Sequence, residues 1–91
     1  MDRQSKADAR KRILAILEEG TVRISGHARK RMADRDVTEE EVRHVLRAGW
    51  VDEPELDKGS WRYPVRTATT CVVVVFRRED TLVVVTTWTE G

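Results

Sequence analysis

Two runs of β-branched residues constrain the fold of this chain more than any other feature. CVVVVF (71–76) and TLVVVTTW (81–88) are continuous, and the four residues between them, RRED, are all charged. β-branched side chains favour strands, and a short polar break between two such runs is typical of a hairpin. Because neither run alternates with polar residues, we expect these strands to be covered on both faces, or on one face and partly on the other.

The segment before the hairpin predicts shorter strands. WVDEP, from residue 50, is typical of a short strand ended by Pro54, and the ELDKGS that follows is typical of a turn. In WRYPVRT (61–67), apolar positions alternate with arginines, which predicts one buried and one exposed face. Pro64 within this strand favours an edge position or a bulge, because proline has no N–H to donate.

The first half of the chain predicts helices instead. Ser5 and Thr38 each stand three residues before an acidic residue, as in a capping box, and Gly20 and Gly49 follow the last residues at helical spacing. Residues 21–25 are either a short edge strand or an extended entry into the next helix. The expected helices cover about residues 5–19, 26–35 and the stretch from Thr38 to Gly49.

Helices followed by strands define an α+β protein. A chain of 91 residues has room for one core, so we expect a single domain over 1–91, with helices at about 5–48 and an antiparallel sheet of three to four strands at about 50–89. A hydrophobic fraction of 40% supports a compact fold without a large enclosed cavity. Any functional site is therefore expected to be a surface groove.

Several classes of protein are excluded by what the sequence lacks. No apolar run approaches the roughly 18 residues of a membrane span, and the N-terminus is too polar for a signal peptide, so we expect a cytoplasmic protein with no membrane association. Cys71 is the single cysteine, which rules out an internal disulfide and a cysteine-based metal cluster. Without CxxC, HExxH or a Gly-rich phosphate loop, we expect no metal and no cofactor.

Charge is segregated along the chain although the net charge is only +1. Residues 1–35 contain ten Lys and Arg against five Asp and Glu, whereas residues 36–57 contain two against eight. A basic surface concentrates polyanions such as nucleic acids. Equally, neighbouring basic and acidic helices can pair their charges, and charge alone does not decide between these interpretations.

SGHARKRMADR (25–35) is the strongest candidate for a site. Its residues His27, Arg31 and Arg35 stand at i, i+4 and i+8, which places them within about 80° on one helix and along about 12 Å. We call these three residues the basic ridge. Guanidinium groups bind phosphate oxygens bidentately, and histidine titrates close to neutral pH, so the ridge suits phosphodiester chemistry. The same pattern is also that of a solvated helix face.

Beyond the spacing, the sequence resembles a bacterial family with a domain of unknown function. The resemblance rests on SGHARKRMADRDVTEEEV, then LRAGWV, WRY and the closing VVVTTW, and it covers about residues 24–88. The family pattern has the core S-x-HA-x-x-RM-x-x-R. In size and element order it is similar to RelE/MqsR-like toxins, the metal-independent ribonucleases of toxin–antitoxin pairs, which pack helices on a curved antiparallel sheet and cleave RNA in its groove.

This resemblance implies a toxin-type endoribonuclease in which a ribose 2′-hydroxyl attacks the adjacent phosphate. His27 would act as base or acid, while Arg31 and Arg35 would hold the phosphate. The expected partners are RNA and a cognate antitoxin protein, and the oligomeric state stays open. Substrate contacts are expected from residues on the same helix and on two strands, namely Arg29, Lys30, Tyr63, Thr86 and Trp88.

Two alternatives to the enzyme remain open. The first is a non-catalytic module that uses the basic ridge to bind nucleic acid or protein. The second is an inactive relative kept for antitoxin binding. Among the other polar groups, His44 is expected on or near the surface of the third helix, and Cys71 is expected to behave as a small core hydrophobe.

Overall fold

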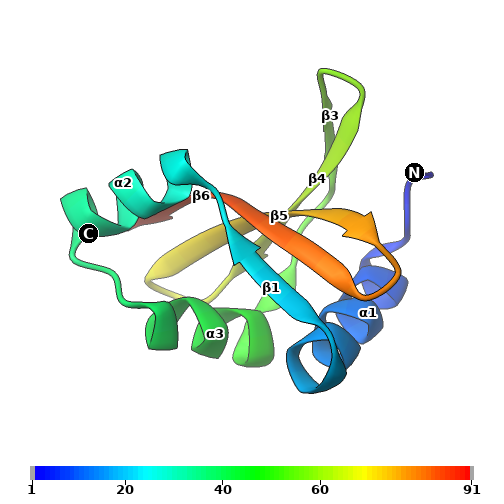
Figure 1. The fold of residues 1–91 in the computed structure, drawn as a ribbon, viewed down its shortest axis with the longest axis horizontal. Helices are drawn as coiled ribbons and strands as arrows, with labels where there is room; N and C mark the ends of the chain where they lie inside the picture. The colour runs from blue at the N-terminus through cyan, green and yellow to red at the C-terminus, as the bar shows by residue number, and fades with distance from the viewer. Residues whose placement is uncertain (1, 91) are drawn as a thin grey trace.

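The structure, a computed structural model, describes residues 2–90 as an α+β fold, which confirms the predicted class (Figure 1). The helices come early in the chain, and the longest strands come last. In chain order the elements are α1 (Lys6–Glu19), β1 (Thr21–Ile24), α2 (Gly26–Arg35), α3 (Glu39–Ala48), β2 (Trp50–Val51), β3 (Glu55–Asp57), β4 (Ser60–Arg66), β5 (Thr70–Arg78) and β6 (Thr81–Thr89).

The helix boundaries follow the capping signals in the sequence. The Ser5 side chain accepts a hydrogen bond from the Asp8 backbone N–H at 3.1 Å and so begins α1. The Thr38 capping box is complete, because the Thr38 side chain accepts from the Glu41 backbone while the Glu41 side chain accepts from the Thr38 backbone. Gly49 ends α3, as predicted.

The sheet is larger than predicted and is mixed rather than purely antiparallel. Its strands lie in the order β1-β6-β5-β4-β2, and β3 pairs with β4. Residues 21–24 form an edge strand, β1, which runs parallel to the first half of β6. Residues 55–57, expected to be part of a turn, form β3, so the structure has six strands where three to four were predicted. The central β5–β6 hairpin is the one predicted from the two β-branched runs.

Pro64 lies within β4, which has neighbours on both sides rather than being an edge strand. On one side Pro64 is the register partner of Val73 of β5. Its carbonyl points to the other side, where it accepts from the Asp52 backbone N–H at 2.8 Å. This point lies between the end of β2 and the start of β3, so the missing N–H of the proline interrupts no strand pairing.

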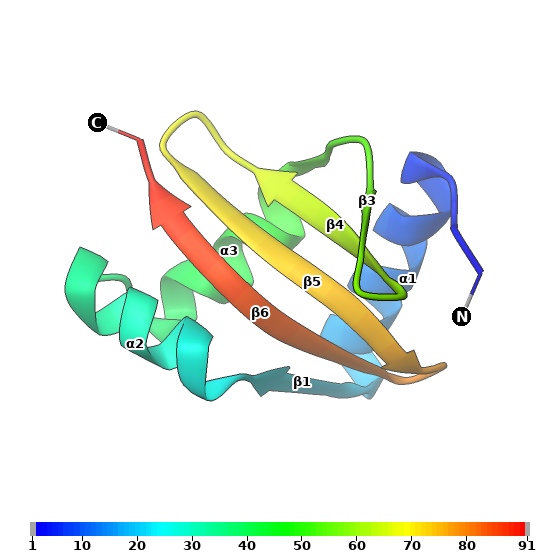
Figure 2. The same ribbon diagram turned by 90° about the horizontal axis from the view of Figure 1, so that it is seen from above.

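The helices cover one face and one edge of the sheet (Figures 1 and 2). The core lies between that face and helices α1 and α3, with Ile13, Leu46, Val65, Val74 and Leu82 among its fully buried residues. β1 lies along the first half of β6, and α2 continues along the same edge beside its second half (Figure 2). The other face of the sheet, which we call the open face, carries the candidate site.

The side chains at the centre of the open face are nevertheless largely buried. Val73, Val75 and Cys71 point to this face of β5 and are each at most 6% exposed. Long side chains of the adjoining strands, including Arg66 and Trp88, lie over them in place of a second layer of helices. The unbroken CVVVV run is therefore covered on both faces, as its lack of alternation predicts.

Candidate functional site

The basic ridge lies on the solvent-exposed side of α2. Ser25 caps this helix by accepting from the Ala28 backbone N–H at 3.0 Å, and Ala28 and Met32 anchor it in the core. The three ridge residues are exposed. Within residues 2–90, none of them has an ion pair or side-chain hydrogen bond, so no carboxylate competes with an incoming anion.

The two flanks of α2 face different sides of the molecule. Arg29 pairs with Glu39 of α3 at 2.9 Å, so its flank faces the helical layer. At 100° per residue, Arg31 and Arg29 stand on opposite sides of the buried Ala28–Met32 stripe. The basic ridge therefore lies on the flank turned toward the open face, whereas Arg29, an expected substrate contact, is already bound to a carboxylate. Lys30 is exposed.

The open face contains a groove that brings together two of the predicted substrate contacts, Thr86 and Trp88, on β6, the strand that α2 borders. A β-bulge in β6 places them there. Val73 pairs with Thr86 but Val74 pairs with Val84, which leaves Val85 as the extra residue. This extra residue reverses the alternation, so that both predicted side chains share a face with the outward residues of β4. We call this site the Trp88 groove; it is lined by Arg62, Pro64, Arg66, Val73, Thr86 and Trp88.

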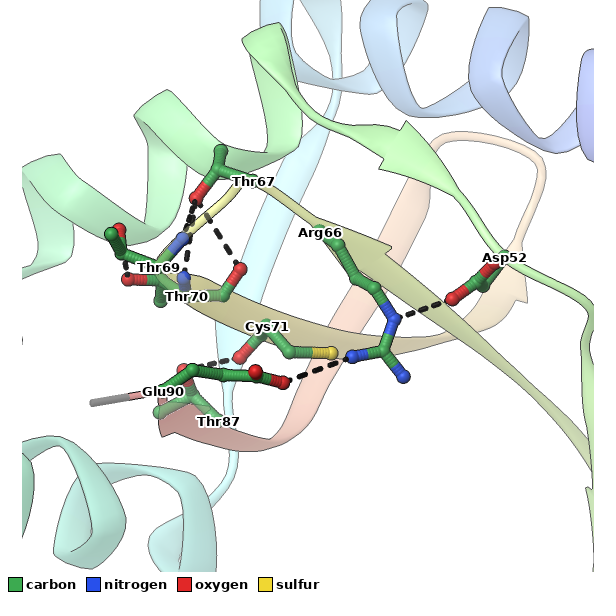
Figure 3. Close-up of polar contacts among 8 residues, drawn as sticks. All are labelled: Asp52, Arg66, Thr67, Thr69, Thr70, Cys71, Thr87 and Glu90. Carbon is green, nitrogen blue, oxygen red and sulfur yellow. Dashed lines mark hydrogen bonds and ion pairs between the residues drawn. The ribbon is translucent and has the colours of Figure 1, made fainter.

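The arginines of the Trp88 groove are held by carboxylates. Arg66 binds Asp52, which follows β2, and forms a second ion pair with Glu90 (Figure 3). The distance from the Arg66 guanidinium to the nearer Glu90 oxygen is 3.6 Å. Its guanidinium carbon also lies 5.7 Å from the centre of the Trp88 ring. The hydrogen bond that the Arg66 Nε–H donates to Asp52 raises the pKa of Arg66. The charge of Arg66 is therefore matched locally while its guanidinium stands over the Trp88 ring.

Arg62, on the same strand, is also paired. It forms an ion pair with Asp57 at 3.0 Å. Glu55 adds a further carboxylate to the lining of the groove. The Trp88 groove is thus close to neutral, with a rigid aromatic ring and an apolar floor.

Cys71 lies beneath Arg66, its register partner across β4 and β5 (Figure 3). The thiol is 1% exposed, and burial raises the pKa of Cys71 from 9.0 to about 11, although the nearby Arg66 opposes this shift. Its backbone carbonyl accepts from the Thr87 hydroxyl at 2.7 Å. A thiol that stays protonated and covered is a poor nucleophile, so Cys71 belongs to the packing of the sheet.

Tyr63 was expected to position substrate, but the structure separates it from the other expected contacts. It lies on the core face of β4 and is 2% exposed. Its hydroxyl accepts from the Gln4 backbone N–H at 2.8 Å, and its ring lies 5.1 Å from that of Phe76. Tyr63 therefore fixes the N-terminal segment to the sheet and does not line the Trp88 groove.

A second groove, which is basic, is not predicted by the local sequence patterns. It lies on the open face where β6 begins between β1 and the end of β5, and we call it the Arg23 groove. The pair Arg77–Arg78 was interpreted only as part of a charged hairpin turn, and Arg23 stands 54 residues away from it. The signal that could have joined them is the parallel pairing of β1 with β6, which local patterns do not reveal. The lining includes Thr21, Arg23, Arg77, Arg78, Asp80 and Val83.

Residues 2–90 contain no group of three or more His, Cys, Asp or Glu side chains arranged to hold a metal ion. In the same range, no helix has the length and apolar character needed to cross a membrane. His44, the second histidine, is exposed on α3, in the helical layer away from the open face.

Comparison with known proteins identifies the family. Residues 24–89 match the family model described as Domain of unknown function (DUF4258). The chain belongs to this family. No curated protein and no solved structure matches the chain. The DUF4258 region runs from the end of β1 to the end of β6, so it contains the basic ridge and the Trp88 groove but not α1.

Proposed function

We propose that this DUF4258 protein is a RelE/MqsR-like, metal-independent endoribonuclease of the toxin type. In this proposal it acts in the cytoplasm and is inhibited by an antitoxin protein. The observation that carries the proposal is the exposed basic ridge, free of carboxylate partners within residues 2–90, on the flank of α2 that borders the uncovered sheet face. A cationic ridge beside an open aromatic groove suits single-stranded RNA, whose phosphates and bases need different contacts.

In this proposal the basic ridge and the Trp88 groove bind different parts of the RNA. Arg31 and Arg35 are placed to hold phosphate oxygens, since their planar guanidinium groups offer paired donors. In the Trp88 groove, the Trp88 ring supplies a face on which a base can stack, at about 1–3 kcal/mol per base. The Thr86 hydroxyl supplies a donor or acceptor beside it.

The chemistry follows from the one histidine on the ridge. His27 takes the proton of a ribose 2′-hydroxyl, whose oxygen then forms a bond to the adjacent phosphorus. The bond from phosphorus to the 5′-oxygen breaks, and that oxygen takes a proton from solvent or from the protonated His27. The products are a 2′,3′-cyclic phosphate and a free 5′-hydroxyl. Arg31 and Arg35 stabilise the extra negative charge of the transition state.

The test compares two histidines. We expect the purified protein to cleave single-stranded RNA in the presence of chelator, and His27→Ala to lower the rate about 100- to 10,000-fold, the usual contribution of a general acid or base. His44→Ala is the matched control, because His44 is also exposed but lies on α3. The same pair should differ in growth arrest when expressed in bacteria.

Three outcomes would contradict the proposal. Equal rates for the two folded variants would remove His27 from the chemistry. Activity that needs an added divalent ion would show a different mechanism. RNA binding without any cleavage by the wild-type protein would favour the non-catalytic binding module.

A further inference from the structure

The Arg23 groove concentrates positive charge at one end of the open face. Three of its lining residues are arginines, and Asp80 is the acid among them. Among the residues that the structure describes, neither Arg23 nor Arg77 forms an ion pair. The Asp80 carboxylate accepts from the neighbouring Thr81 hydroxyl at 3.1 Å. In contrast to the Trp88 groove, this groove is therefore not neutralised by its own carboxylates.

The fold itself brings these arginines together. Val22 and Ile24 pack against the core, so Arg23 between them points to the open face. Arg23 is the register partner of Val83, and Val83 is also the partner of Val75 on the other side. Arg77 stands two residues beyond Val75 on β5. The parallel pairing of β1 with β6 thus sets arginines from the two ends of the chain around one groove.

Gathering like charges in one place raises their mutual repulsion, which a bound anion relieves. Guanidinium groups match phosphate in shape as well as in charge. We propose that the Arg23 groove binds a phosphate of the RNA backbone and is a second anchoring point for the strand that the basic ridge holds. This inference depends on RNA being the ligand of the proposed function, but not on cleavage.

The geometry of the β6 edge supports one continuous path. β1 and α2 follow each other along this edge (Figure 2), and Arg23 precedes His27 by four residues. The four residue steps from Arg23 to His27 span at most about 13 Å at about 3.3 Å per residue. The Arg23 groove and the basic ridge therefore lie at the two ends of a short basic track, which suits a polyanion better than a single small phosphate.

Salt dependence of RNA binding tests this inference. The probe is a 2′-O-methyl oligouridylate, which lacks the free 2′-hydroxyl and so stays intact during the titration. Each phosphate contact to a single strand contributes about 0.7 to the slope of log K against log salt concentration. We expect Arg23→Gln and Arg77→Gln each to lower the slope, and the double variant to lower it by about 0.7, the contribution of the one phosphate that the groove binds. Circular dichroism melts verify that the variants fold.

Arg43→Gln is the matched control, because it removes the same charge from an exposed position on α3. Slopes equal to the wild type in all variants would overturn the inference, even if RNA cleavage is found. Lowered slopes for the groove variants alone would support it, even if cleavage is absent. A titration with inorganic phosphate separates the two sources of the anion: groove variants that lose phosphate binding but keep the RNA slope would overturn the RNA assignment.

Discussion

Arg66 illustrates how a sheet with helices on one face keeps its other face covered. Its guanidinium binds Asp52 and lies near Glu90, while it stands over the Trp88 ring. The aliphatic stem of an arginine can cover apolar surface while its charged head stays in water. Cys71 is buried beneath it. Arginines of this kind hold the fold together, and those of the basic ridge, with no such partners within residues 2–90, are the ones available to a ligand.

The buried thiol gives a prediction about pH. Burial raises the pKa of Cys71 from 9.0 to about 11, so the native state holds this proton more tightly than the unfolded state does. The stabilisation is complete below pH 9 and is lost as the pH rises toward 11, by about 2–3 kcal/mol for two pKa units. Urea unfolding at pH 8 and pH 11 measures it. Cys71→Ala should show a smaller loss than the wild type, and an equal loss in both proteins would contradict this account.

At the scale of the elements, the end of α3 depends on a close backbone contact. A Cβ at Gly49 would lie 2.5 Å from the Arg66 carbonyl oxygen and 2.6 Å from that of Val45. Gly49→Ala should therefore lower the free energy of unfolding by about 1–3 kcal/mol, as overpacking does. Gly26→Ala is the control: its Cβ meets nothing within 4 Å, and alanine should favour the helix by about 0.5–1 kcal/mol. Unfolding midpoints that move together would show that the contact is not tight.

Elements with local signals could be predicted from the sequence, and those that depend on distant partners could not. Thr38 and Gly49 mark the two ends of α3 directly beside the helix in the sequence, and both caps are present in the structure. β1 has only a brief alternation, and its partner β6 lies 60 residues away along the chain. β3 buries little apolar surface, since its one large apolar side chain, Leu56, is 59% exposed. It pairs because Lys58 and Gly59, both at positive φ, turn the chain back onto β4.

At the scale of the whole molecule, some of the segregated charges pair between helices and others stay exposed without a partner within residues 2–90. Arg29 and Glu39 pair across α2 and α3, as expected for neighbouring helices of opposite charge. The basic ridge does not pair in this way within residues 2–90, so part of the excess positive charge stays on the open-face side. Helical spacing was enough to predict that ridge. The Arg23 groove was hidden because it needs the β1–β6 register, and Trp88 reaches its groove only through the bulge at Val85.

Whether the whole molecule works as an enzyme or as a binding module depends on what Arg31 and Arg35 do. In a binding module they are ordinary phosphate contacts, and lysine replaces them with little change, because counterion release depends on charge. In a ribonuclease their planar donors meet a phosphate whose charge grows in the transition state, a geometry that lysine does not reproduce. We therefore expect Arg31→Lys and Arg35→Lys to keep RNA affinity within a few-fold but to lose on the order of 100-fold in cleavage rate.

The measurement pairs single-turnover cleavage with a binding titration at one fixed salt concentration. Arg43→Lys, an exposed change on α3, is the control for both assays. Small, parallel losses in rate and affinity would mean that the ridge arginines only attract RNA. A large loss in rate with affinity retained requires that the guanidinium groups contact the reacting phosphate, because no change in net charge accompanies the substitution. That separation decides between the two functions without depending on the identity of the RNA or of the antitoxin.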